Sequence, residues 1–171
     1  MANAGVIGAG SWGTALSVLL HKNGHQVTVW SIDENEVKML NEKREHESKL
    51  PGVKIPQDMV ITGEPEESVR GRDFHVMAVP SPFTRTTARK MKPYVSEGQI
   101  IVDVAKGIEE DTLLTLSRQI EEEIPQADVA VLSGPSHAEE VGRGLPTTCV
   151  IGAKTKETAE YLQSMFISNV F

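Results

Sequence analysis

A glycine-rich turn near the amino terminus constrains the fold of this chain more than any other feature. The short apolar run Gly5-Val6-Ile7 leads into glycines at positions 8, 10 and 13, and an amphipathic segment follows. This is the G-x-G-x-x-G spacing of a strand that turns into a helix beside a dinucleotide. Gly8 permits the tight turn, Gly10 has no Cβ to obstruct a pyrophosphate, and Gly13 lets the helix pack on the strand. The context favours a dinucleotide site over an ordinary glycine-rich turn.

The segment after this turn completes a βαβ unit. The helix is expected to end at Asn23-Gly24, and a second strand is expected over residues 26–30. Unpaired N–H groups and partial positive charge at the start of such a helix attract phosphates. The apolar residues at helical spacing are Trp12, Ala15, Leu16, Leu19 and Leu20.

Strand and helix patterns alternate through the rest of the chain. We predict strands over residues 59–62, 74–79, 100–104, 129–132 and 148–151, with another beginning at 170–171. Helices are predicted over 65–70, 84–91, 113–124, 137–142 and 155–166, and a charged surface loop over 41–58. This alternation predicts an α/β fold: a Rossmann-like, doubly wound, mostly parallel sheet with helices on both faces. Residues 1–171 suit one dinucleotide-binding domain.

Charge, cysteine content and hydropathy exclude several other classes of protein. The chain has 17 Lys and Arg against 24 Asp and Glu, a net charge of −7, and lacks the basic cluster that nucleic acid requires. Its one cysteine, Cys149, is expected to be a buried structural thiol in a reducing cytoplasm. We expect no membrane span, because no apolar stretch approaches the roughly 20 residues that a bilayer demands. The histidines and the cysteine show no metal-ligand spacing.

Unusual residues follow four of the predicted strands. Ligands of an open parallel sheet bind outside the carboxyl ends of its strands, so these four segments should line one crevice. They are the glycine turn, Pro80-Ser81-Pro82, Lys106-Gly107 and Ser133-Gly134-Pro135-Ser136. The ammonium of Lys106 would point at the ligand, whereas a solvated surface lysine is its common alternative.

Three polar residues have structural interpretations that compete with a functional one. Asp33 lies about 20 residues beyond the glycine turn and could bind a ribose hydroxyl. We favour Asp33 as a helix cap, with Glu36 completing a capping-box-like pair. Ser136 and Glu139 have the spacing of a second capping box. His75 is alone in an apolar strand and is expected to be a hydrogen-bonded core residue.

Further motifs follow the glycine turn in a fixed order along essentially all 171 residues. They are Gly8 to Leu16, Asn23-Gly24-His25, Val29-Trp30, Leu50-Pro51-Gly52-Val53, Val79-Pro80-Ser81, Ala105 to Glu109, Ser133 to Val141 and Arg143 to Thr147. Together they resemble the bacterial-type NAD(P)-dependent glycerol-3-phosphate dehydrogenases. Several motifs in register are far more specific than the glycine turn alone.

The resemblance implies reversible hydride transfer between sn-glycerol 3-phosphate and dihydroxyacetone phosphate, in the synthesis of glycerophospholipids. By motif match, the cofactor would contact Ser11, Trp12, the position of Ile32, Lys106 and Ala138, in addition to the three glycines. The substrate would contact Lys106, Gly134 and Ser136. The resemblance also implies an all-helical second domain. For the full-length enzyme, a homodimer is one option.

Two departures from the family bear on these implications. The family often has Arg or His where this chain has Ile32, so the cofactor is NAD or NADP, with a preference for NAD. The chain stops at Phe171, before the family's proton-transferring lysine, so no catalytic residue is expected within it and the fragment alone should be inactive. The alternatives are a related 3-hydroxyacid-type dehydrogenase and a stand-alone dinucleotide-binding sensor.

Overall fold

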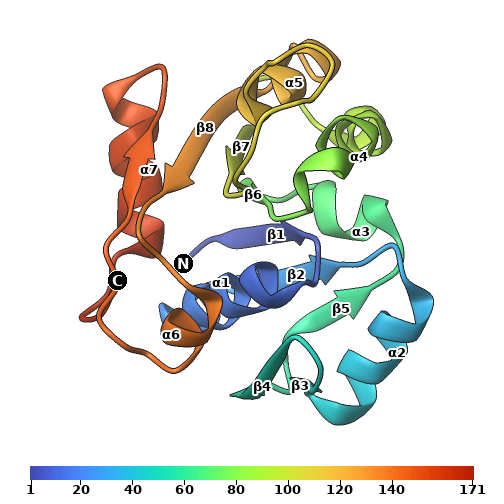
Figure 1. The fold of residues 1–171 in the computed structure, drawn as a ribbon, viewed down its shortest axis with the longest axis vertical. Helices are drawn as coiled ribbons and strands as arrows, with labels where there is room; N and C mark the ends of the chain where they lie inside the picture. The colour runs from blue at the N-terminus through green and yellow to red at the C-terminus, as the bar shows by residue number, and fades with distance from the viewer.

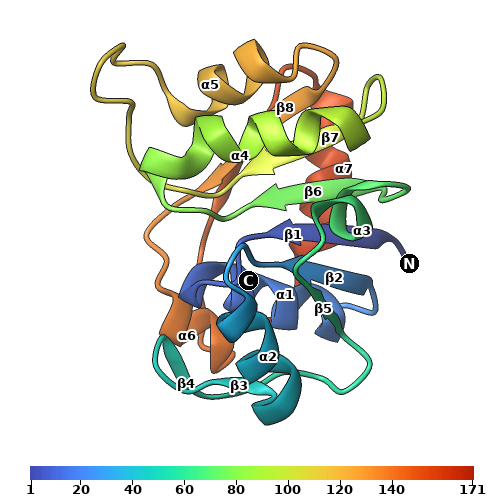
Figure 2. The ribbon, with the colours of Figure 1, turned by 90° about the vertical axis from the view of Figure 1, so that its right-hand side faces the viewer.

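The computed structural model describes residues 1–171 and contains a seven-stranded sheet. Its strands are β1 (Asn3–Ile7), β2 (Gln26–Trp30), β5 (Val60–Thr62), β6 (Phe74–Met77), β7 (Ile100–Asp103), β8 (Asp128–Ser133) and β9 (Val150–Gly152). Their spatial order is β5-β2-β1-β6-β7-β8-β9, and only β9 runs antiparallel to its neighbour (Figure 1; Figure 2). The Rossmann-like, mostly parallel sheet is confirmed.

Two layers of helices bury the two faces of the sheet. One face packs against α1 (Ser11–Lys22), α6 (Ala138–Gly142) and α7 (Lys156–Phe166), and the other against α3 (Pro65–Val69), α4 (Thr84–Met91) and α5 (Leu116–Glu123). Successive strand residues face opposite layers, so Val6 packs in the first core and Ile7 in the second, and both are fully buried. This double burial explains why the strands have almost continuous apolar sequences. None of the helices combines the length and apolar character of a membrane crossing.

The predicted surface loop at 41–58 is wrong. α2 (Glu34–Lys43) continues into this stretch, and β3 (Glu45–His46) and β4 (Leu50–Lys54) then form an antiparallel hairpin. Leu50 and Val53 are buried beneath α1 and α6. α6 approaches so closely that a Cβ at Gly142 would lie 2.7 Å from Val53 Cγ2. The apolar residues scattered between the charges of this segment therefore belong to the core.

Other boundaries differ for local reasons. The helix expected from residue 113 begins at Leu116, because Thr115 caps it and Leu113 has a left-handed backbone with φ of 58°. Residues 170–171 form no strand; the Val170 carbonyl accepts a hydrogen bond from Thr147 N in a turn. Cys149 is half-buried rather than buried.

His75 also departs from its prediction. Its side chain is fully buried on β6, but neither ring nitrogen has a hydrogen-bond partner. Burial lowers the pKa of His75 to about 4, because the interior disfavours the imidazolium. The residue is therefore a neutral core histidine without hydrogen bonds.

Candidate functional site

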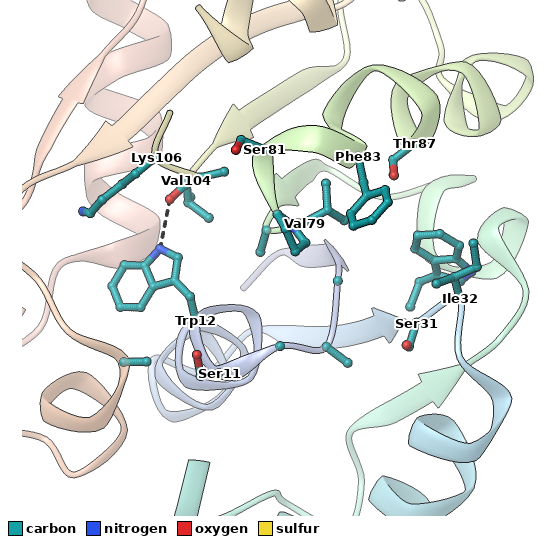
Figure 3. Close-up of a pocket in the computed structure, with 18 of the residues that line it drawn as sticks. Ser11, Trp12, Ser31, Ile32, Val79, Ser81, Phe83, Thr87, Val104 and Lys106 are labelled. Carbon is teal, nitrogen blue, oxygen red and sulfur yellow. Dashed lines mark hydrogen bonds between the residues drawn. The ribbon is translucent and has the colours of Figure 1, made fainter. Parts of the chain in front are cut away.

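One crevice collects all four strand ends that the sequence singled out. A cavity of about 610 Å³ opens at the carboxyl edge of the sheet. It is lined by residues from the ranges 8–12, 30–32, 78–81, 104–106 and 136–139, together with Glu36 and residues of the β6–α4 connection and α4. Figure 3 shows Trp12 and Lys106 toward one end of this cavity and Ser31 and Ile32 toward the other.

The glycine turn is built as the motif requires. Gly8 has φ of 111°, which side chains rarely adopt, and its N–H donates to the Trp30 carbonyl at 2.9 Å. A Cβ at Gly13 would lie 1.9 Å from the Gly8 carbonyl oxygen, so helix and strand meet only because Gly13 has none. A Cβ at Gly10 would meet no protein atom within 4 Å. The protein itself does not need glycine at position 10, and this open approach fits a bound pyrophosphate.

Trp12 connects this turn to the centre of the crevice. Its indole Nε1 donates a hydrogen bond to the Val104 carbonyl at 3.1 Å, just beyond β7 (Figure 3). Ser11 lies beside it at the start of α1 and also lines the cavity. The start of α1 and the end of β7 are therefore fixed to each other.

Lys106 crosses the crevice to the loop after β8. Its Nζ donates to the Gly134 carbonyl at 3.1 Å, although the side chain is exposed. A Cβ at Gly134 would lie 2.6 Å from the Thr148 carbonyl oxygen, so this loop also packs tightly. The structure thus brings Lys106 and Gly134 together and places the ammonium at the cavity.

An ion pair that the sequence patterns did not reveal holds the loop of Lys106. Glu109 accepts hydrogen bonds from Arg85 Nε at 2.7 Å and from Nη2 at 2.8 Å, and Arg85 also contacts Glu123 on α5 at 2.9 Å. These bonds lower the pKa of Glu109 to about 2. Arg85 lies 24 residues from Glu109, and no local spacing signals such a pair.

The start of α6 differs from the predicted capping box. The N-cap is His137, which makes no side-chain cap, and Ser136 Oγ instead donates to the Gly134 carbonyl at 3.4 Å. The box at Ser136 and Glu139 is therefore wrong. Ser136 and Ala138 both line the cavity, as their predicted site roles require.

The polar residues just beyond β2 have different roles: one caps a helix and another lines the cavity. Asp33 caps α2, accepting from Asn35 N at 2.9 Å, which confirms the favoured interpretation. The exposed Ile32 lines the cavity, as expected. Glu36 does not complete a capping box; its carboxylate bonds to Ser31 and lines the cavity. Sequence reasoning missed this orientation of Glu36.

The sequence of this chain is similar to those of known proteins along its whole length. The profile described as "NAD-dependent glycerol-3-phosphate dehydrogenase N-terminus" matches residues 3–159. The chain belongs to this family. A protein of Agathobacter rectalis named glycerol-3-phosphate dehydrogenase [NAD(P)+] is 61% identical over 171 residues, covering 100% of this chain and 51% of that protein. A Fusobacterium nucleatum protein of the same name is 49% identical, covering 100% of this chain and 52% of its own length.

Solved structures agree with the family assignment. A glycerol-3-phosphate dehydrogenase of Coxiella burnetii is 27% identical with a TM-score of 0.93, covering 99% of this chain and 52% of that chain. A yeast enzyme of the same name, 22% identical, has a TM-score of 0.86 over 100% of this chain and 55% of its own, and shows the shared fold. The chain therefore spans about half the length of these family members.

Proposed function

We propose that this chain is the cofactor-binding half of a dehydrogenase that interconverts sn-glycerol 3-phosphate and dihydroxyacetone phosphate. The observation that carries the proposal is one cavity that joins the glycine turn to Lys106 in a member of this family. A bound nicotinamide dinucleotide would supply or accept the hydride. The residues of this chain bind and orient the two reactants.

The open approach above Gly10 fits the pyrophosphate, and the N–H groups at the start of α1 supply hydrogen-bond donors. Ser11, Trp12, Ile32, Lys106 and Ala138 line the same cavity and are the proposed cofactor contacts. The proposed substrate contacts, Lys106, Gly134 and Ser136, gather at the loop after β8 through two hydrogen bonds to the Gly134 carbonyl.

Reduction of a ketone also requires a proton donor, and a phosphate dianion requires several donors or cations. We propose that an all-helical domain following Phe171 supplies both, since the relatives are about twice as long as this chain. Lys106 then contributes one charge to the substrate site and is not the proton donor. The isolated chain should bind the cofactor but show no turnover.

NAD(H) is the proposed preferred cofactor. Ile32 lines the cavity at the end of β2 and supplies no cation to a 2′-phosphate. A charge-assisted hydrogen bond would contribute about 1.5–3 kcal/mol there. The 2′-phosphate of NADP(H) therefore gains no charge-assisted hydrogen bond from the side chain at position 32.

The test of the proposed reaction is the Lys106→Ala variant of the full-length protein. If Lys106 stabilises the transition state through one charged hydrogen bond, kcat/KM for dihydroxyacetone phosphate should fall roughly 100-fold. Affinity for NADH should change much less, because the glycine turn supplies most of it. Lys156→Ala, at an exposed position on α7 outside the cavity lining, is a control for the loss of one positive charge. Near-normal activity of Lys106→Ala would show that Lys106 is a solvated surface residue and does not stabilise the transition state.

A further inference from the structure

A buried carboxylate that no motif explains lies directly before the segment that carries Lys106. Asp103 is the last residue of β7 and is only 3% exposed. Because strand residues alternate, Asp103 shares the face of Ile101, which α4 and α5 cover, and it does not line the cavity. The next three residues, Val104, Ala105 and Lys106, all line the cavity. Asp103 therefore lies behind the cavity wall and not within the cavity.

No cation neutralises this carboxylate. Its register partners on the flanking strands are Met77 of β6 and Val131 of β8, neither of which ionises. None of the ion pairs of the chain includes Asp103. Burial raises the pKa of Asp103 to about 6, and the hydrogen bond from the Ala105 N–H opposes this rise.

The charged residues of the two covering helices have other partners or lie elsewhere. All of them are exposed or half-buried; they are Arg85, Arg89 and Lys90 on α4, and Arg118, Glu121, Glu122 and Glu123 on α5. The three arginines pair with glutamates of this set or with Glu109. Lys90 lines the cavity, and the Lys106 ammonium bonds to the Gly134 carbonyl. Asp103 is therefore an isolated buried charge when it is ionised.

One hydrogen bond connects Asp103 to the cavity wall. Its Oδ1 accepts from Ala105 N at 3.1 Å. The intervening residue is held on both sides, because Val104 N donates to the Met77 carbonyl at 3.1 Å and the Val104 carbonyl accepts from Trp12 Nε1 at 3.1 Å (Figure 3). Of these three acceptors, only Asp103 can change its charge. The backbone immediately before Lys106 therefore depends on an ionisable group.

The ionised carboxylate does not stabilise the fold. Its pKa in the folded protein lies above the model value of 3.8, so the free energy of unfolding decreases as pH rises from about 4 to about 6. A charged acceptor nevertheless forms a hydrogen bond roughly twice as strong as a neutral one. Asp103 at neutral pH thus holds the Ala105 N–H firmly although its charge lowers stability. This combination favours a role in the site over a role in stability.

We infer that Asp103 is a positioning residue, whose ionised carboxylate holds the turn at 104–106 so that Lys106 faces the proposed substrate site. This inference rests on the proposed function, because Lys106 can act on the substrate only if the cavity is the active site. Protonation leaves a neutral, weaker acceptor for the Ala105 N–H. The Lys106 ammonium should then be held less precisely, and turnover should decrease at acidic pH.

The amide proton of Ala105 reports on this bond in the chain without any ligand. In proton–nitrogen correlation spectra, we expect the Ala105 resonance of wild type to titrate with a midpoint of about 6. Asp103→Asn keeps an acceptor oxygen but cannot ionise, so this titration should disappear. Asp73→Asn is the matched control, because Asp73 also accepts from a backbone amide, Asn3 N at 2.6 Å, and lies outside the cavity lining. It should leave the Ala105 titration unchanged.

Kinetics of the full-length protein test the effect on Lys106. The ratio of kcat/KM for dihydroxyacetone phosphate between wild type and Asp103→Asn cancels the protons bound by the substrate and by other groups. We expect this ratio to be roughly fivefold at about pH 8 and to approach one at about pH 5, where wild-type Asp103 is also neutral. The free energy of unfolding of Asp103→Asn at neutral pH should not decrease, since the variant buries no charge.

Several results would overturn the role of Asp103 and leave the proposed function intact. They are an Ala105 resonance that does not titrate in wild type, a kcat/KM ratio that is independent of pH, and a loss of activity that a loss of stability accompanies. Full-length wild type that binds NADH but does not reduce dihydroxyacetone phosphate would instead contradict the proposed function.

Discussion

The indole nitrogen of Trp12 donates a hydrogen bond to the Val104 carbonyl oxygen at 3.1 Å. Trp12 belongs to the glycine turn, and Val104 lies just beyond β7, two residues before Lys106. One bond therefore joins the proposed phosphate site to the segment that delivers the proposed substrate contact. This bond adds a direct link to the connection that the sheet already provides between the two segments.

Replacing Trp12 with phenylalanine tests the structural value of this bond. Trp12→Phe retains an aromatic ring at the cavity but leaves the Val104 carbonyl without its donor. We expect the free energy of unfolding to fall by about 1 kcal/mol, the usual net contribution of one such bond. Urea denaturation followed by circular dichroism measures it, and an unchanged midpoint and slope would show that the bond contributes nothing.

The Arg85–Glu109 pair should position Lys106 without touching the reactants. In the full-length protein, Glu109→Gln weakens the two-point pair and should lower kcat/KM roughly tenfold, equivalent to about 1.4 kcal/mol of transition-state stabilisation. NADH affinity should stay within about twofold. Arg89→Met is the matched control, because Arg89 shares Glu123 with Arg85 but does not contact Glu109. Equal losses in both variants would indicate a general effect of the charge network.

His75 should make stability depend on pH. Its pKa of about 4 in the folded protein lies below the ordinary 6.5, so the unfolded chain binds more protons between these values. The free energy of unfolding should therefore decrease as pH falls from 6.5 to 4, by about 3 kcal/mol from this residue.

The His75→Leu variant should lose this dependence. Asp103 must be separated from it, because burial raises the Asp103 pKa to about 6 and its contribution has the opposite sign over a similar range. The relevant quantity is therefore the difference between the urea-denaturation curves of wild type and His75→Leu at each pH. Parallel curves from pH 7 to pH 4 would refute the assignment to His75.

Sequence patterns predicted the elements whose signals are local. The strand at 26–30 and the helix at 84–91 have the boundaries expected, and the glycine turn lies where its spacing placed it. The hairpin at 45–54 was missed because its buried residues, including Leu50, are scattered among charges and prolines. Its core role depends on contacts with distant helices, which no local pattern contains.

The same distinction between local signals and contacts with distant segments applies to the site. The expectation that ligands bind outside the carboxyl ends of parallel strands correctly placed the four segments around one cavity. The direction of each strand is enough to decide at which edge of the sheet it ends. The orientations of Glu36 and Ser136 could not be predicted from their spacing. Glu36 bonds to Ser31 outside α2 instead of closing the capping box, and Ser136, which precedes the cap of α6, bonds to the Gly134 carbonyl. His46 and Lys49 reach Glu36 only after the hairpin has folded against α2.

The most direct test of the cofactor site is a calorimetric titration of Gly10→Val with NADH. Position 10 has φ of −64° and ψ of −177°, which valine can adopt, and no protein atom lies within 4 Å of its Cβ position. The variant should therefore fold normally, while its side chain occupies the proposed path of the pyrophosphate. Gly152→Val, at another open glycine on β9 outside the cavity, is the matched control. We predict no measurable binding to Gly10→Val and normal binding to Gly152→Val; undiminished affinity in a folded Gly10→Val protein would contradict the assignment of this turn.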